Sequence, residues 1–155
     1  MQFITNNELE TKALGEKLGR LLKPGDCICL DGDLGVGKTH FTKGLALGMG
    51  IEEEITSPTF TIVQEYNGKT RLYHFDVYRL FDEEDLYGIG FEDHLRGDGV
   101  IVIEWSDKVK GALPIDRLEI RIEYMSKAEK RKIVMSPLGT ASRGLIEKMQ
   151  EGQSI

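Results

Sequence analysis

Residues 32–39 read Gly-Asp-Leu-Gly-Val-Gly-Lys-Thr, which is a complete match to the phosphate-binding pattern G-x-x-x-x-G-K-[ST]. An apolar run from Cys27 to Leu30 precedes the pattern, and helical periodicity follows it. Glycine lets the backbone curl until successive amide groups point at one phosphate, and the following helix adds its positive N-terminal end. The stretch therefore predicts a nucleoside triphosphate site. A plain glycine-rich turn is the simpler alternative, but it does not require the Lys-Thr pair.

The lysine and the threonine of such a loop have separate tasks. Lys38 is expected to reach the β- and γ-phosphates, and the Thr39 hydroxyl is expected to ligate the Mg²⁺ ion that bridges the same oxygens. The predicted nucleotide-binding residues along this stretch are Gly32, Asp33, Leu34, Gly35, Val36, Gly37, Lys38, Thr39 and His40.

Composition limits the classes of function. The chain has 155 residues, of which 40% are hydrophobic, and this suits one domain with a single core. Its 26 acidic and 20 basic residues give a net charge of −6, so we expect any contact with RNA to be indirect or local. No leader-like N-terminus and no membrane-spanning apolar stretch is readable, which predicts a cytoplasmic protein. Cys27 and Cys29 are expected to be small buried side chains in a reducing compartment.

Hydrophobic periodicity outlines the secondary structure. Val100 to Ile103 is a continuous aliphatic run, typical of a strand buried on both faces. Asn67-Gly68 predicts a two-residue hairpin turn, because this dipeptide accepts positive φ angles. The expected elements are a helix that ends before Pro24, a strand over 26–31, a helix over 38–49, a hairpin of 62–66 and 70–75, short helices within 83–95, a strand over 100–103, and a hairpin of 118–124 and 131–135.

These elements predict an α/β protein, with a P-loop NTPase-like three-layer fold and a mixed, partly antiparallel central sheet. Residues 1–137 are expected to form a single P-loop domain. Residues 138–155 are expected to be a short C-terminal helix or a flexible tail of the same domain.

Two acidic residues at strand ends are candidates for the metal site. Glu104 follows four aliphatic residues, an arrangement that places a carboxylate beside the phosphate loop, although it also suits an ordinary strand end. Asp76 ends another strand, and Arg79 could be its ion-pair partner or a charge stabiliser. His74 is in phase with Asp76, but a lone histidine is more often structural.

Residues 56–61 form a hydroxyl-rich segment around a rigid proline, downstream of the loop helix. Other triphosphate hydrolases place a segment that senses the γ-phosphate there, so Ser57, Pro58 and Thr59 are candidate switch or partner residues. A turn that leads into a strand is the alternative. Trp105 could stack on a nucleotide or anchor a partner, or it could simply pack.

The chain resembles the TsaE family of bacterial P-loop ATPases in the order and spacing of its motifs across residues 1–135. Two of these motifs, SPTF and HFD-x-YR, are not general features of P-loop proteins. The motifs are residues 32–39, Ser57-Pro58-Thr59-Phe60-Thr61, His74-Phe75-Asp76-Val77-Tyr78-Arg79 and Ile103-Glu104-Trp105.

The resemblance implies an ATPase that supports threonylcarbamoyladenosine formation at position 37 of tRNAs reading ANN codons. It implies ATP and Mg²⁺ as cofactors, TsaD and TsaB as protein partners, and hydrolysis that resets their complex between turnovers. By matching motif, the resemblance places phosphate on Lys38 and Mg²⁺ on Thr39 and Glu104, with Asp76 helping the metal or the attacking water. It also implies nucleotide contacts from Asn7 or a neighbour and from Arg131.

Three other functions use the same loop. A small-molecule kinase needs an acceptor site and usually a mobile lid, for which no clear sequence is present. A GTPase needs a guanine-reading Asn-Lys-x-Asp motif, which is missing from the sequence. A nucleotide-gated binding module would hydrolyse almost nothing by itself, and it overlaps with an ATPase that is slow until a partner orders its site.

Overall fold

The computed structural model describes residues 1–33, 35–56, 58, 63–80 and 83–151. Its elements are β1 (Gln2–Thr5), α1 (Glu8–Gly19), β2 (Cys27–Gly32), α2 (Lys38–Gly48), β3 (Val63–Tyr66), β4 (Arg71–Asp76), α3 (Glu83–Tyr87), α4 (Phe91–Leu95), β5 (Gly99–Glu104), the 3₁₀ segment η1 (Ser106–Ala112), β6 (Leu118–Tyr124), β7 (Arg131–Pro137) and α5 (Thr140–Glu151).

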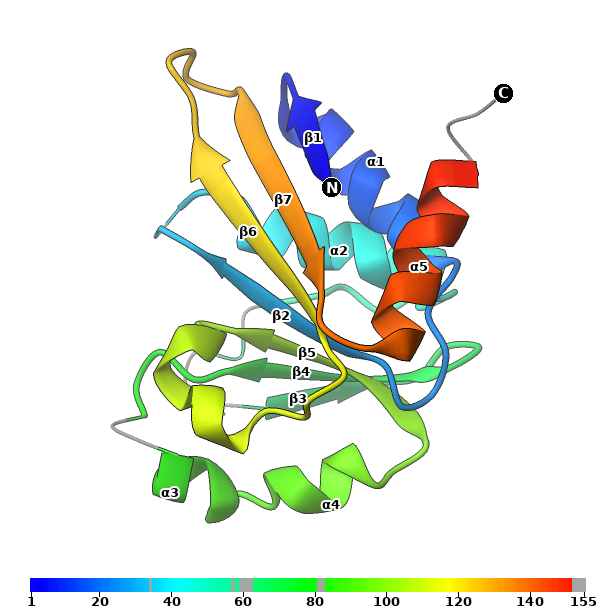
Figure 1. The fold of residues 1–155 in the computed structure, drawn as a ribbon, viewed down its shortest axis with the longest axis vertical. Coiled ribbons are helices and arrows are strands. Elements are labelled where there is room, and N and C mark those ends of the chain that lie inside the picture. Colours follow the sequence, from blue (N-terminus) through cyan, green and yellow to red (C-terminus); the bar gives the residue numbers. More distant parts are fainter. Residues whose placement is uncertain (34, 57, 59–62, 81–82, 152–155) are drawn as a thin grey trace.

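One twisted sheet organises the molecule, with the strand order β1-β7-β6-β2-β5-β4-β3 (Figure 1). Its centre is parallel, because β2 pairs in parallel with both β5 and β6, and β4 pairs in parallel with β5. Antiparallel pairs β1–β7, β6–β7 and β3–β4 complete the two sides. The predicted mixed, partly antiparallel sheet is confirmed.

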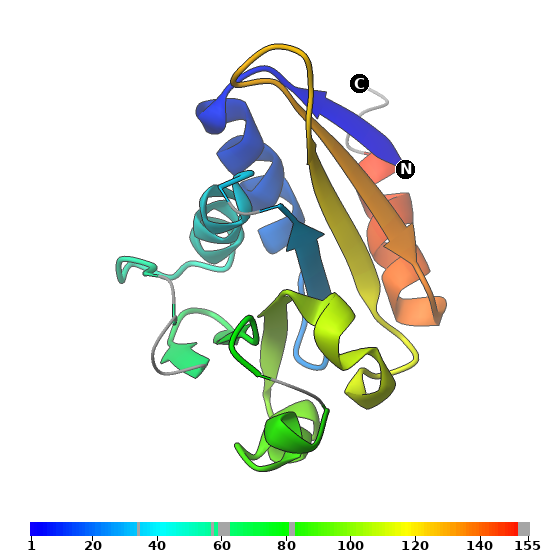
Figure 2. The same ribbon diagram turned by 90° about the vertical axis from the view of Figure 1, so that its left-hand side faces the viewer.

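Alternation along the strands divides the core between the two faces of the sheet. In β5, Val100 and Val102 join a cluster with residues of α1, α2 and α5, whereas Ile101 and Ile103 join one with residues of α3, α4 and η1. The three helical segments α3, α4 and η1 lie together at the lower side of the molecule in both views (Figures 1 and 2). The predicted three-layer arrangement is therefore confirmed. Cys27 and Cys29 are buried in the second cluster.

Glycines bring α1 and α2 unusually close together. Gly15 and Gly19 of α1 are spaced by four residues, as are Gly44 and Gly48 of α2, so each pair lies on one face of its helix. A Cβ atom added at any of the four would lie under 3.0 Å from a backbone oxygen of the other helix. The contact fixes α1 against the helix that follows the phosphate loop.

The first hairpin differs from the prediction. β3 ends at Tyr66 and β4 begins at Arg71, so residues 67–70 connect the strands, and the expected two-residue Asn-Gly turn is wrong. The loop is held by contacts outside the hairpin: the Lys69 N–H donates to the Met49 carbonyl at 3.1 Å, and Gly68 lies directly against the backbone of Met49 and Gly50. Docking on the end of α2 thus overrides the local turn preference.

Helix α5 packs onto the first core cluster through Leu145, Ile146 and Met149. Its N-terminus is capped from outside by Asp116, whose carboxylate accepts hydrogen bonds from the backbone N–H groups of Ala141 at 2.8 Å and Ser142 at 3.1 Å. No helix in the part of the chain that the structure describes is long and apolar enough to cross a membrane.

Asp116→Asn is expected to lower the free energy of unfolding by about 1 kcal/mol near neutral pH, because it removes a charged cap. Hydrogen bonds, first that from Ala141, hold the pKa of Asp116 below its usual value of 3.8. The carboxylate's contribution is therefore complete above that value and is lost as the pH falls through the lower folded pKa. Urea denaturation near pH 7 and near pH 2 checks this, because the unchanged protein and Asp116→Asn should have the same free energy of unfolding in acid. An equal difference at both pH values would contradict the assignment.

Candidate functional site

The phosphate loop connects the end of β2 to the start of α2 at the centre of the sheet. Gly35 and Gly37 have φ angles of 77° and 114°, in the left-handed region that glycine adopts at little cost. Gly37 is the N-cap of α2, so its helix begins at Lys38. The backbone is thus curled as an anion-binding loop requires, with the helix N-terminus at its end. Leu34, one of the predicted nucleotide ligands, lies outside the described residues.

A cavity of about 390 Å³ opens at this loop, and residues far apart in the sequence line it. The lining includes seven of the predicted nucleotide ligands and both predicted carboxylates. The lining residues are Glu8, Thr11, Gly35, Val36, Gly37, Lys38, Thr39, His40, Asp76, Tyr78, Arg79, Glu104, Trp105, Glu129 and Arg131.

Lys38 is held within its own loop. The side chain is buried, with 6% of the residue exposed, and Nζ donates to the carbonyls of Gly32 at 2.6 Å and Asp33 at 3.1 Å. The same nitrogen lies 4.0 Å from the centre of the Trp105 ring. Burial lowers the pKa of Lys38, and the nearby carboxylates, Glu104 foremost, partly oppose that shift. Lys38 also lines the cavity, so an anion bound there would further favour the ammonium form.

Asp76 and Glu104 lie side by side, because they are register partners at the ends of the parallel strands β4 and β5. Burial raises the pKa of Asp76, and a hydrogen bond from the Tyr78 backbone N–H at 3.0 Å opposes the rise. Glu104 is almost fully buried, with its Oε2 2.6 Å from Nε2 of His74. The structure thus brings both predicted carboxylates to one edge of the cavity.

These carboxylates suit a Mg²⁺ site that nucleotide phosphates complete. Thr39 adds a hydroxyl to Asp76 and Glu104 in the cavity lining. Across the described ranges no group of three or more His, Cys, Asp and Glu side chains could hold a metal ion by itself. Mg²⁺ in nucleotide sites typically takes one or two carboxylates together with phosphate oxygens and water. The residues present therefore fit such an ion.

Arg131, the first residue of β7, connects the last hairpin to the phosphate loop. Its Nε donates to the Val36 carbonyl at 2.8 Å, and its guanidinium lies 4.6 Å from the centre of the Tyr124 ring. Arg131 lines the cavity as the resemblance implies for a nucleotide contact.

Two other predicted nucleotide ligands lie around the start of α1. Nε2 of His40 lies 3.4 Å from a carboxylate oxygen of Glu8, so the two side chains close one side of the cavity. Asn7 is the N-cap of α1, and its Oδ1 accepts from the Glu10 N–H at 2.9 Å. The cavity is lined here by Glu8 and Thr11 rather than by Asn7 itself.

Trp105 has the one positive φ angle, 64°, among the non-glycine residues that the structure describes. Such a backbone costs of order 1–2 kcal/mol and persists only where the surroundings enforce it. Its N–H donates to the Leu30 carbonyl at 3.2 Å, and its ring packs 4.8 Å from that of Tyr78. Trp105 thereby lies between the loop lysine and Tyr78, which is 49% exposed.

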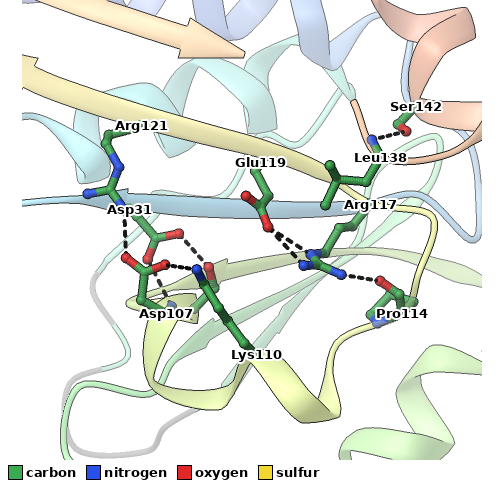
Figure 3. A network of polar contacts seen from close by, with 10 residues as sticks. Asp31, Asp107, Lys110, Pro114, Arg117, Glu119, Arg121, Leu138 and Ser142 are labelled. Carbon is green, nitrogen blue, oxygen red and sulfur yellow. Dashed lines mark hydrogen bonds and ion pairs between the residues drawn. The ribbon is translucent and has the colours of Figure 1, made fainter. Parts of the chain in front are cut away.

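A polar network that the sequence analysis did not predict connects β2 to η1 (Figure 3). Asp31, buried at the end of β2, accepts from the Ser106 hydroxyl and from the Asp107 N–H at 3.2 Å. Asp107 in turn pairs with Arg121 of β6 at 2.7 Å. Burial raises the pKa of Asp31, and the Ser106 hydrogen bond opposes the rise. One feature of the sequence could have indicated a role for Asp31: it is an acidic residue at the end of an apolar strand, directly before the phosphate loop.

The candidate switch segment is described only in part, because Ser57 and Thr59 lie outside the described residues. Pro58 is buried. Next to it, the Thr56 N–H donates to the Tyr66 hydroxyl at 3.3 Å and the Thr56 hydroxyl donates to Gln64 at 3.2 Å. The segment therefore starts from an anchorage on β3.

The loop, the helix N-terminus and the mixed parallel sheet define a P-loop NTPase-like protein of the α/β class. Residues 5–133 match the family model of the threonylcarbamoyl adenosine biosynthesis protein TsaE. The chain therefore belongs to the TsaE family, whose members take part in tRNA threonylcarbamoyladenosine biosynthesis.

Individual relatives agree with this assignment. The TsaE protein of Bacillus subtilis is 41% identical over 156 residues, which cover 100% of this chain and 97% of the relative. That of Treponema pallidum is 45% identical over 126 residues, 81% of this chain and 93% of the relative. The crystal structure of YdiB from Bacillus subtilis superposes with a TM-score of 0.87 at 37% identity, covering 99% of this chain and 96% of that one.

Proposed function

We propose that the chain is a Mg²⁺-dependent ATPase that supports threonylcarbamoyladenosine modification of adenosine 37 in tRNAs reading ANN codons. It does so by binding and resetting a complex of TsaB and TsaD, and it meets tRNA only through that complex. The observation that carries the ATPase is the gathering of Lys38 and Thr39 from α2 with Asp76 and Glu104 from β4 and β5 around one cavity.

Each residue has a distinct part in phosphate chemistry. The loop amides and Lys38 bind the β- and γ-phosphates, and Thr39 and Glu104 hold Mg²⁺. The ion, when bound, neutralises charge that develops on the phosphate oxygens. Asp76 lies beside Glu104, and burial raises the pKa of its carboxyl group. At this position its carboxylate can orient the attacking water or act as a further ligand of the metal ion. Arg79 also lines the cavity, and its guanidinium group can approach the negative charge that develops on the phosphate oxygens.

The free protein is built to hydrolyse slowly. The Lys38 ammonium donates to carbonyls of its own loop and faces Trp105, so it must reorient before it can reach a γ-phosphate. Trp105 in turn contacts Tyr78, an exposed aromatic side chain that a partner protein can reach. A partner bound there would change the position of Trp105 and release the lysine, so the activity would depend on a second chain.

Steady-state ATP hydrolysis, measured with Mg²⁺ for the chain alone and with the TsaB–TsaD pair of the same organism, tests this proposal. We expect low turnover alone and a stimulation by the pair of at least about tenfold, which corresponds to about 1.4 kcal/mol of the activation free energy. Glu104→Gln should lower stimulated turnover by about 100-fold or more, because a metal ligand loses its charge.

The possible failures of this experiment point to different alternatives. Nucleotide-dependent binding of the pair without hydrolysis would indicate a nucleotide-gated binding module. Hydrolysis that the pair does not change, with no nucleotide-dependent binding, would contradict the role in tRNA modification, and the kinase alternative would then be tested with candidate acceptors. Unchanged turnover in Glu104→Gln would contradict the metal site.

A further inference from the structure

His74 is a buried imidazole to which the proposed hydrolysis assigns no task. It lies in β4 two residues before Asp76, its exposure is 0%, and its ring nitrogen Nε2 lies 2.6 Å from Oε2 of Glu104. Glu104 belongs to the neighbouring strand β5 and lines the cavity, whereas His74 does not line it. The imidazole therefore reaches the site only through the glutamate.

The surroundings of the other ring nitrogen, Nδ1, indicate which nitrogen of His74 carries the proton. Nδ1 is buried and has no hydrogen-bond partner among the described residues. A proton on Nδ1 would be a buried donor without a partner among the described residues, which is more costly than an unpaired lone pair. The geometry therefore favours a proton on Nε2, from which the ring donates a hydrogen bond to the Glu104 carboxylate.

The unpaired Nδ1 also argues that His74 is not present for packing. A leucine would fill a fully buried position of this strand without leaving a polar atom unsatisfied. What only the histidine supplies is the donor to Glu104. Carboxylates that bind metal ions are commonly fixed by such a second hydrogen bond, and its removal weakens metal binding even though the donor never touches the ion.

We propose that His74 is a positioning residue for Mg²⁺: by holding one carboxylate oxygen of Glu104, it fixes the orientation in which that carboxylate meets the ion beside Thr39 and Asp76. This inference rests on the proposed function, because it assigns to the same cavity the task of binding nucleotide with Mg²⁺. It concerns the affinity for the ion rather than the affinity for the nucleotide alone.

A matched pair of variants tests the reach of the donor. Glutamine at position 74 carries its amide N–H about as far from the backbone as Nε2 of histidine, whereas asparagine carries the same amide on a chain shorter by one methylene and cannot reach Glu104. ADP binding is followed through the fluorescence of Trp105, the single tryptophan, in EDTA and across a Mg²⁺ titration. ADP is used because it removes hydrolysis from the measurement.

We expect His74→Asn to raise the Mg²⁺ concentration at half-saturation by about 10–100-fold, and His74→Gln to stay within about threefold of the unchanged protein. In EDTA, all three proteins should bind ADP with the same affinity to within about threefold. In the Glu104→Gln background, exchange of His74 for asparagine should have no further effect on the Mg²⁺ dependence. Should the asparagine variant not fold, His74→Leu, which also lacks a donor, takes its place.

Three outcomes overturn the inference. Equal Mg²⁺ midpoints in the asparagine, glutamine and unchanged proteins would show that the hydrogen bond is not used. Loss of ADP affinity in EDTA by the same factor as in Mg²⁺ would show a merely structural role. In both cases the proposed function stands, because the unchanged protein still binds ADP with Mg²⁺. If the unchanged protein gains no ADP affinity from Mg²⁺, the proposed function fails, and this inference fails with it.

Discussion

Lys38→Met is expected to reduce nucleotide affinity by more than about 100-fold without a loss of stability. Truncating one partner of a buried charge pair costs about 2–5 kcal/mol of binding free energy, and about 3 kcal/mol is already more than a hundredfold in affinity. Methionine keeps the length and apolar stem of lysine, so the change removes the ammonium group and little else. Calorimetric titration with ATP and Mg²⁺ measures the loss.

Lys38→Met is not expected to lower the stability of the folded protein. Burial lowers the pKa of Lys38, which means that the ammonium form is less favourable in the folded chain than in the unfolded chain at pH values below the folded pKa. Near pH 7 the charge therefore opposes folding, and the urea midpoint of Lys38→Met should equal or exceed that of the unchanged protein. Lys43→Met, on the same helix but outside the cavity lining, is the matched control and should bind ATP normally. A marked fall in the midpoint would mean that the lysine stabilises the loop.

Gly44→Ala is expected to lower the free energy of unfolding by about 3 kcal/mol, although alanine is the better helix former. The added Cβ would lie under 3.0 Å from the Lys12 carbonyl oxygen, a backbone atom that can yield only if α1 moves as a whole. Thermal and urea unfolding measure the effect. Because α1 carries Glu8 and Thr11 into the cavity lining, the surviving folded protein should also bind nucleotide more weakly.

Gly144→Ala supplies the control for this substitution. Gly144 is also inside a helix, α5, but an added Cβ there meets no atom within 4 Å. Alanine should therefore raise the free energy of unfolding by about 0.5–1 kcal/mol, which is the difference in helix propensity alone. If both variants lose stability to a similar extent, the close approach of α1 and α2 is not the reason for the first result.

The elements that the sequence predicts well are those with strong local signals. The phosphate loop, the aliphatic strand before Glu104 and the 118–124 and 131–135 hairpin each show their pattern within one short, continuous stretch of sequence. Asp76 and Glu104 could be chosen as candidates because each ends a strand. Their adjacency, however, depends on β4 and β5 being neighbours, which no local pattern determines.

Features that depend on distant contacts were not predictable in the same way. The turn at Asn67-Gly68 shows a strong local preference that yields to docking on Met49. The left-handed backbone of Trp105 is enforced by its neighbours, and tryptophan gives no sign of it. The polar network of Asp31 joins residues 75 positions apart. The glycines spaced by four in both helices were readable, but their meaning required knowing that the two helices face each other.

The pairing of β1 with β7 has a consequence for how the protein is made. Gln2 is the register partner of Val134, so β1 is synthesised long before β7 and cannot join the sheet until β7 has been made. Closing a loop of this length is slow compared with forming the local hairpins, and until it closes β7 presents an unpaired edge to other chains. A newly synthesised copy therefore exposes a strand edge that can pair with other chains until β1 has docked on β7. Chains that lack those first residues would remain in that state.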